Sequence, residues 1–170
     1  MGDQSLYDED ILIWSEQQAA ALRKLAARRD LPNELDLANV IEEIEDVGRS
    51  EFHTVESLSD NIMAHLLLLA ADPDAQAVRG WMVEITAWDV TLRRRISPSM
   101  RARLDMASVW RNGLELAAAK LAVWDESKAA AVSDLGGASC PFTAAEFASD
   151  TRDVAAATAR IKELLAATSR

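Results

Sequence analysis

Apolar residues recur every three or four positions along most of this chain, which is the spacing of one face of an α-helix. The longest such run covers residues 37–71, which we predict to form one long helix, or two collinear ones, with any bend at Gly48 or Ser50. A shorter run predicts a first helix over residues 6–29, followed by a short linker over residues 30–36 in which Pro32 is the helix breaker. No alternation typical of β-strands persists for more than a few residues.

Two later helices are predicted from their start signals. Asp72 before Pro73, and Ser97 before Pro98, each place a capping side chain ahead of a proline at the first helical position. The apolar stripes that follow run over residues 78–96 and 104–124. Three tryptophans on these stripes are predicted to lie in the core: Trp81, Trp88 and Trp110.

The last third of the chain contains its clearest loop, residues 133–141, with two adjacent glycines. Thr143 and Glu146 then have the spacing of a capping box, and Phe142 and Phe147 that of a hydrophobic staple. A final helix is predicted through residues 154–165. Together these patterns predict an all-α fold, an antiparallel helical bundle of about five to six helices, in a single domain over residues 1–170.

Composition narrows the possible functions. The 170 residues are 49% hydrophobic and carry 28 acidic against 18 basic side chains, a net charge of −10. Such a charge argues against nucleic acid and anionic membrane as partners. A single cysteine, Cys140, excludes an internal disulfide and a cysteine zinc cluster. The first ten residues are acidic and no apolar stretch is long enough to span a bilayer, so we expect a cytoplasmic protein.

Several sequence blocks, in their order along the chain, resemble one known family. They are YDEDILIW, EQQAAALR, LDLANVIEEIEDVGRSE, HLL, SPSMRARL and CPFT. The chain therefore resembles the domain of unknown function 29 family of small bacterial proteins, over about residues 7–147, with residues 148–170 as a C-terminal extension. The resemblance implies an all-helical fold and brings no established activity or catalytic residue. The chain departs from the family pattern at Leu68–Ala70, after HLL, and at Gly80.

Four carboxylates lie close together in the predicted long helix. At 100° per residue, Glu42 and Asp46 lie on the solvent-exposed side of this helix, and Glu43 and Glu45 lie on the two flanks of its apolar stripe. The four side chains therefore do not converge on one point. Glu42 and Asp46 are a like-charged pair four residues apart, and Arg49, one turn beyond Glu45 and Asp46, relieves this repulsion. These five residues are either a solvated face or an interaction surface.

Metal binding or hydrolysis is the alternative hypothesis, with Glu43, Glu45 and His65 as candidate ligands. No glutamate has a histidine three residues later, the pairing that di-iron helical bundles use. Glu43 and His65 lie roughly 33 Å apart along a straight helix, so a shared site would need a second chain. His65 is predicted at the edge of the core. Cys140 would be a nucleophile only if the fold brought His65 near it.

The segment from Arg93 to Arg103 is the one feature typical of nucleic-acid binding, but its three consecutive arginines splay around the helix and no aromatic residue is interleaved with them. Our interpretation is a non-catalytic bacterial protein–protein interaction or regulatory module without a cofactor. The predicted partner is a second copy, in a homodimer, or an unidentified protein. Acidic residues 34–60 and basic residues 93–111 are also expected to pair across the bundle.

Overall fold

The computed structural model describes residues 5–28, 31–32, 34–149 and 151–168. These residues form helices and turns without a strand, which confirms the all-α prediction. The helices are α1 (Leu6–Glu9), α2 (Ile11–Ala26), α3 (Leu37–Ala71), α4 (Val78–Arg95), α5 (Pro98–Arg103), α6 (Met106–Leu121), α7 (Glu126–Ser133), the 3₁₀ turn η1 (Asp134–Gly137), α8 (Ala144–Phe147) and α9 (Val154–Thr168). None of the helices described is long and apolar enough to cross a membrane.

The chain divides into two compact units. Unit 1 comprises residues 1–55 and 95–103, and unit 2 comprises residues 56–94 and 104–170. Helix α3 is continuous and contributes its first half to unit 1 and its second half to unit 2. This division reflects how contacts cluster within the chain and does not test the number of domains. The single domain over residues 1–170 therefore stays a prediction.

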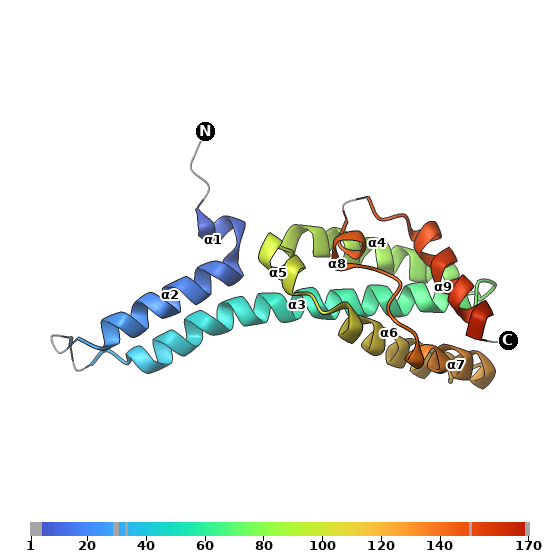
Figure 1. Cartoon of the computed structure of the whole chain (residues 1–170), viewed down its shortest axis with the longest axis horizontal. Helices are drawn as coiled ribbons and strands as arrows, with labels where there is room; N and C mark the ends of the chain where they lie inside the picture. Colours follow the sequence, from blue (N-terminus) through green and yellow to red (C-terminus); the bar gives the residue numbers. More distant parts are fainter. Residues whose placement is uncertain (1–4, 29–30, 33, 150, 169–170) are drawn as a thin grey trace. The chain divides into compact units, whose positions relative to one another are not determined.

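Unit 1 is built on a hairpin in which α2 runs back along the first half of α3 (Figure 1). Its core contains Leu12 and Ala19 from α2 against Leu37, Ile41 and Val55 from α3. The two helices approach closely at Gly48, where a Cβ atom would lie 2.1 Å from Ser15 Oγ and 3.3 Å from Leu12 Cα. A glycine at this point of the LDLANVIEEIEDVGRSE block therefore permits the crossing of the two helices.

Unit 2 packs α4 and α6 against the second half of α3. Its fully buried side chains include Ile62, Leu66, Ile85, Leu92 and Leu121. Here too a glycine permits a close crossing, because a Cβ at Gly113 of α6 would lie 2.5 Å from Met63 Cγ of α3. The core prediction is confirmed for Trp81 and Trp110, which are 6% and 3% exposed. Trp88 is half-buried, with its ring against that of His65.

Local signals gave several elements correctly. The predicted long helix is α3, unbroken at Gly48 and Ser50. The capping box is present, with Thr143 and Glu146 each bonding the other's backbone N–H, and the rings of Phe142 and Phe147 lie 6.1 Å apart. The described residues form more helices than the five or six expected.

The additional helices have two origins: some predicted helices are divided in the structure, and one helix among the described residues was not predicted. The first predicted helix is interrupted at Asp10, which ends α1 and begins α2, and residues 29–30 lie outside the described residues. The fourth ends at Leu121, so Trp124 lies in a turn, where it is 51% exposed. Helix α7, which Asp125 caps, was not predicted.

Candidate functional surfaces

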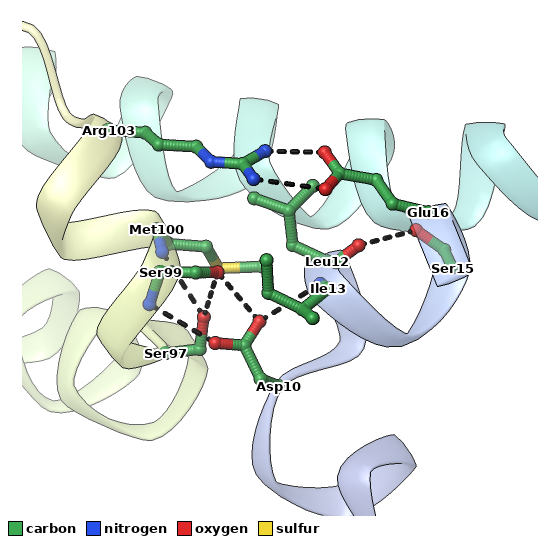
Figure 2. Close-up of polar contacts among 9 residues, drawn as sticks. All are labelled: Asp10, Leu12, Ile13, Ser15, Glu16, Ser97, Ser99, Met100 and Arg103. Atoms are coloured by element: carbon green, nitrogen blue, oxygen red, sulfur yellow. Dashed lines mark hydrogen bonds and ion pairs between the residues drawn. The ribbon is translucent and has the colours of Figure 1, made fainter. Parts of the chain in front are cut away.

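Asp10 is the centre of a polar cluster in unit 1 that joins two distant sequence blocks (Figure 2). Its Oδ1 accepts hydrogen bonds from the Ile13 N–H at 3.2 Å and from Ser99 Oγ at 2.7 Å, and its Oδ2 accepts from the Ser99 N–H at 3.1 Å. Asp10 therefore caps the N-termini of both α2 and α5. Ser97 Oγ completes the α5 cap by accepting from the Met100 N–H at 3.3 Å.

The electrostatics of Asp10 suit this capping function. Burial pushes the pKa of its carboxyl upward, but the hydrogen bonds from Ser99, Ile13 and Ser97 outweigh burial, and the pKa lies below its usual value. Asp10 is 8% exposed and its acceptor sites are occupied by the two helix ends. A carboxylate of this kind stays charged near neutral pH and is a poor general acid or base.

Ion pairs also join helices of unit 1. Arg103 of α5 donates two hydrogen bonds to Glu16 of α2, at 2.5 and 3.0 Å (Figure 2). Arg95, at the end of α4, lies 2.7 Å from Glu51 of α3. The pair of Arg95 and Glu51 confirms the expected contact between basic residues 93–111 and acidic residues 34–60. Arg103 instead pairs with Glu16, which lies outside the acidic segment. Two arginines of the candidate nucleic-acid segment are thus engaged in ion pairs.

The five residues of the predicted interaction surface have different surroundings. Glu45 is half-buried and lies 2.6 Å from Arg23 of α2, so this carboxylate joins the two helices of the hairpin. Asp46 accepts from Arg49 Nε at 2.8 Å on the wet side of α3. Glu42 and Glu43 are exposed. As predicted, the four carboxylates do not converge.

An exposed apolar stripe lies beside Glu43. Val40 and Val47 are 39% and 41% exposed, and Ile44 between them is half-buried. At 100° per residue these three side chains lie within about 60° of one another, and Glu43 lies on their outer flank. Val40 and Val47 belong to the apolar run over residues 37–71, which predicts them on the buried side of α3. They lie at its edge instead, since α2 covers the side of α3 that carries Leu37, Ile41 and Gly48.

His65 is enclosed in unit 2 and is 0% exposed, rather than at the core edge as predicted. Its Nδ1 lies 2.9 Å from the Asn61 carbonyl oxygen, which must accept, so Nδ1 carries a proton. Its Nε2 lies 3.2 Å from Lys120 Nζ of α6 and 2.8 Å from Glu84 Oε2 of α4. Neutral His65 therefore accepts from Lys120, whereas the imidazolium form would donate to Glu84.

Burial lowers the pKa of His65, and Lys120 adds to this effect, against the smaller opposing effects of Asn61 and Glu84. Folding then favours the neutral ring. The neutral His65 ring therefore makes its full contribution to the stability of the folded state above the unfolded pKa of about 6.5. This contribution is lost as the pH falls towards the lower pKa of the folded state. Because the unfolded chain binds the additional proton, the free energy of unfolding falls by up to about 1.4 kcal/mol per pH unit in this window.

We therefore expect the protein to lose stability as the pH falls from about 7 through the unfolded pKa of about 6.5, and His65→Gln to remove most of that dependence. Urea denaturation at several pH values measures this. His53→Gln is the matched control, because His53 is the other histidine of the chain and is exposed. An unchanged pH dependence in His65→Gln would show that other groups cause it.

Cys140 and His65 are not brought together by any contact among the described residues. The thiol is half-buried beside a cavity of about 450 Å³ that is also lined by Trp110, Arg111, Gly136 and Gly137. Burial raises the pKa of the Cys140 thiol, which disfavours the nucleophilic thiolate. Within the part of the chain described, no three or more His, Cys, Asp or Glu side chains are grouped to hold a metal ion.

These features place the chain in the class of all-α proteins, and its polar clusters link one helix to another. The sequence pattern of the family described as Domain of unknown function DUF29 matches residues 6–151. The chain belongs to this family, and α9 lies beyond the matched region.

One similar solved structure is the crystal structure, at 1.45 Å resolution, of an alpha-helical protein of unknown function from Rhodospirillum rubrum. It is 32% identical, the match covers 93% of this chain and 98% of that chain, and the TM-score is 0.79. This similarity supports the all-α fold and indicates no specific activity. Comparison with curated proteins gave no match.

Proposed function

We propose that the protein is a non-catalytic interaction module of the bacterial cytoplasm that binds a protein partner through the exposed face of α3 in unit 1. The observation that carries this proposal is the stripe of Val40, Ile44 and Val47 with Glu43 beside it. Exposed apolar side chains next to charged ones are typical of surfaces that associate with other proteins.

The alternatives receive less support from the residues that would perform them. The best-connected carboxylate, Asp10, is occupied by capping two helices, and His65 has no exposed surface to offer a substrate. Arg95 and Arg103 are engaged with Glu51 and Glu16. Metal binding or hydrolysis, and nucleic-acid binding through residues 93–103, stay predictions.

The chemistry of the α3 face favours a basic amphipathic helix as its partner. Apolar residues at helical spacing on the partner would cover Val40 and Val47, in the manner of other helix-docking surfaces. Lysine or arginine beside them would pair with Glu43, and Glu42 and Asp46 would attract the partner from farther around the helix. Such charge complementarity mainly raises the association rate and the specificity.

Affinity capture with the tagged protein from cytosol tests this proposal. The face variant combines Val40→Ser, Glu43→Lys and Val47→Ser. A matched control combines Leu116→Ser, Glu115→Lys and Val123→Ser, which also alters two exposed apolar residues and one exposed acid. We expect the parent and the control to retain a protein that the face variant loses by at least about tenfold, equivalent to about 1.4 kcal/mol. Identical capture by all three proteins would contradict the proposal.

A further inference from the structure

Helix α4 in unit 2 carries a second exposed apolar stripe. Val83 and Met82 are 68% and 50% exposed, Ala87 is exposed, and Val90 is half-buried. These side chains and Thr86 line a shallow depression of about 470 Å³. Val83, Ala87 and Val90 follow one another at intervals of four and three residues, so they lie on one side of the helix.

The stripes on α3 and α4 share one spacing and carry opposite charges at their ends. The α3 series begins at Asp36, one residue before the helix, and continues through Val40, Ile44, Val47 and Glu51. Glu51 also pairs with Arg95 of its own chain, at 2.7 Å. The α4 series is Arg79, Val83, Ala87, Val90 and Arg94. Each series has successive intervals of four, four, three and four residues. Each therefore covers an arc of about 80° over a length of about 22 Å.

The two surfaces are complementary in charge and in size. With the stripes laid against each other in either direction, both acidic ends of the α3 stripe meet arginines of the α4 stripe. The large Ile44 then meets the small Ala87, with valines on both sides of this pair. Pairing α3 with α3 would place acids against acids, and pairing α4 with α4 would place arginines against arginines, which is unfavourable.

We propose that this complementarity makes the chain its own partner: the α3 stripe of one copy binds the α4 stripe of the next. This inference rests on the proposed function, since the α4 stripe is a basic amphipathic helix of the kind proposed for the α3 face. The contact joins different surfaces of the two copies. It closes into a two-fold dimer where each copy's α3 stripe meets the other copy's α4 stripe, and it extends into a ring or an open chain where each pair of copies makes only one such contact.

Sedimentation velocity of the purified full-length protein over a wide concentration range tests the assembly. One variant reverses the acids at the ends of the α3 stripe (Asp36→Lys, Glu51→Lys), and another reverses the arginines at the ends of the α4 stripe (Arg79→Glu, Arg94→Glu). We expect the parent to assemble as its concentration rises, and each variant to assemble at least about tenfold more weakly. In an equal mixture of the two variants, opposite charges meet again at both kinds of contact, so assembly is expected to recover.

The same experiment contains its controls. Glu115→Lys with Glu163→Lys reverses two exposed acids outside both stripes and is expected to assemble like the parent. Val47→Ser and Val83→Ser shorten the apolar stripes without altering an ion pair, and each is expected to weaken assembly. Circular dichroism and thermal unfolding show whether each variant is folded. At about 1 M salt, where the screening length falls to about 3 Å, assembly of the parent is expected to weaken.

Three results would overturn the inference. The first is a parent protein that stays monomeric at every concentration. The second is a variant reversed in one stripe that assembles like the parent, which would indicate a symmetric contact through the other stripe. The third is a mixture that fails to recover. A monomeric parent that captures a separate protein, which the face variant loses, would overturn self-assembly and leave the proposed function in place.

Discussion

Replacing Gly48 with alanine is expected to destabilise the protein, although alanine is the better helix former. In an open helix the change would add up to about 1 kcal/mol of stability. Here the new Cβ would lie 2.1 Å from Ser15 Oγ and 3.3 Å from the backbone at Leu12 Cα. Ser15 is 1% exposed and donates to the Leu12 carbonyl, so its hydroxyl cannot turn away without losing that bond. Overpacking costs about 1–3 kcal/mol and the lost hydrogen bond of Ser15 about 1 kcal/mol, so after the gain in helix propensity we expect a net loss of about 1–3 kcal/mol.

The free energy of unfolding from urea denaturation measures this loss, and two further variants isolate its cause. Ser15→Ala removes the atom nearest the new Cβ, so the double variant Ser15→Ala/Gly48→Ala is expected to recover most of the stability. Gly80 lies within α4, and a Cβ added to it would meet nothing within 4 Å, so Gly80→Ala is expected to stabilise the protein. Gly48→Ala proving as stable as the parent would show that α2 and α3 do not cross this closely.

The elements that could be predicted from the sequence are those decided by local interactions. The α3 pattern is self-consistent over 35 residues, so no tertiary contact was needed to recognise it. The capping box at Thr143 lies within four residues. Trp124 was misplaced because its apolar character continues the α6 stripe, whereas its indole N–H donates to Asp72 Oδ2 at 3.1 Å beyond the end of that helix. An exposed tryptophan with a polar partner has no distinct sequence pattern.

The candidate surfaces were less predictable because they depend on which elements meet. Helical periodicity alone places His65 near the apolar stripe of α3. Its enclosure depends on contacts with Glu84 of α4 and Lys120 of α6, which the periodicity of α3 does not contain. Val40 and Val47 match the stripe equally well, yet α2 leaves them exposed. For Asp10 a signal was present, since an aspartate directly before an apolar run is a helix start. The YDEDILIW block was instead interpreted as part of one uninterrupted helix.

Four of the sequence blocks that carry the family resemblance meet in unit 1. Asp10 belongs to the first block, Arg23 to the second, Glu45 and Gly48 to the third, and Ser99 to the SPSMRARL block. Each of these residues joins two helices: Asp10 with Ser99, Arg23 with Glu45, and Gly48 through the crossing of α2 and α3. These motifs therefore help to explain the architecture of unit 1, and Asp10 is the residue among them that caps two helices.

Asp10→Ala is expected to destabilise the protein by about 2–4 kcal/mol, because one helix cap contributes about 1 kcal/mol and this carboxylate caps two helices. The loss also leaves the Ser99 hydroxyl without its acceptor at 2.7 Å, in a cluster where Asp10 and Ser97 are 8% and 6% exposed. Asp10→Asn retains one acceptor oxygen and is expected to cost less. Asp153→Ala, which removes an exposed cap of α9 alone, is the matched control and is expected to cost less than Asp10→Ala.

The pH dependence separates the charge of Asp10 from its shape. The folded pKa of Asp10 lies below its usual value of 3.8, so the charged carboxylate stabilises the folded state fully above about pH 4. This contribution is lost as the pH falls through the folded pKa, where protonation of the folded protein removes an acceptor. The difference in free energy of unfolding between the parent and Asp10→Asn is therefore expected to shrink as the pH falls from about 5 to below the usual pKa of 3.8. A difference that stays constant over this range would show that Asp10 acts through its shape alone, and that the two helices do not require its charge.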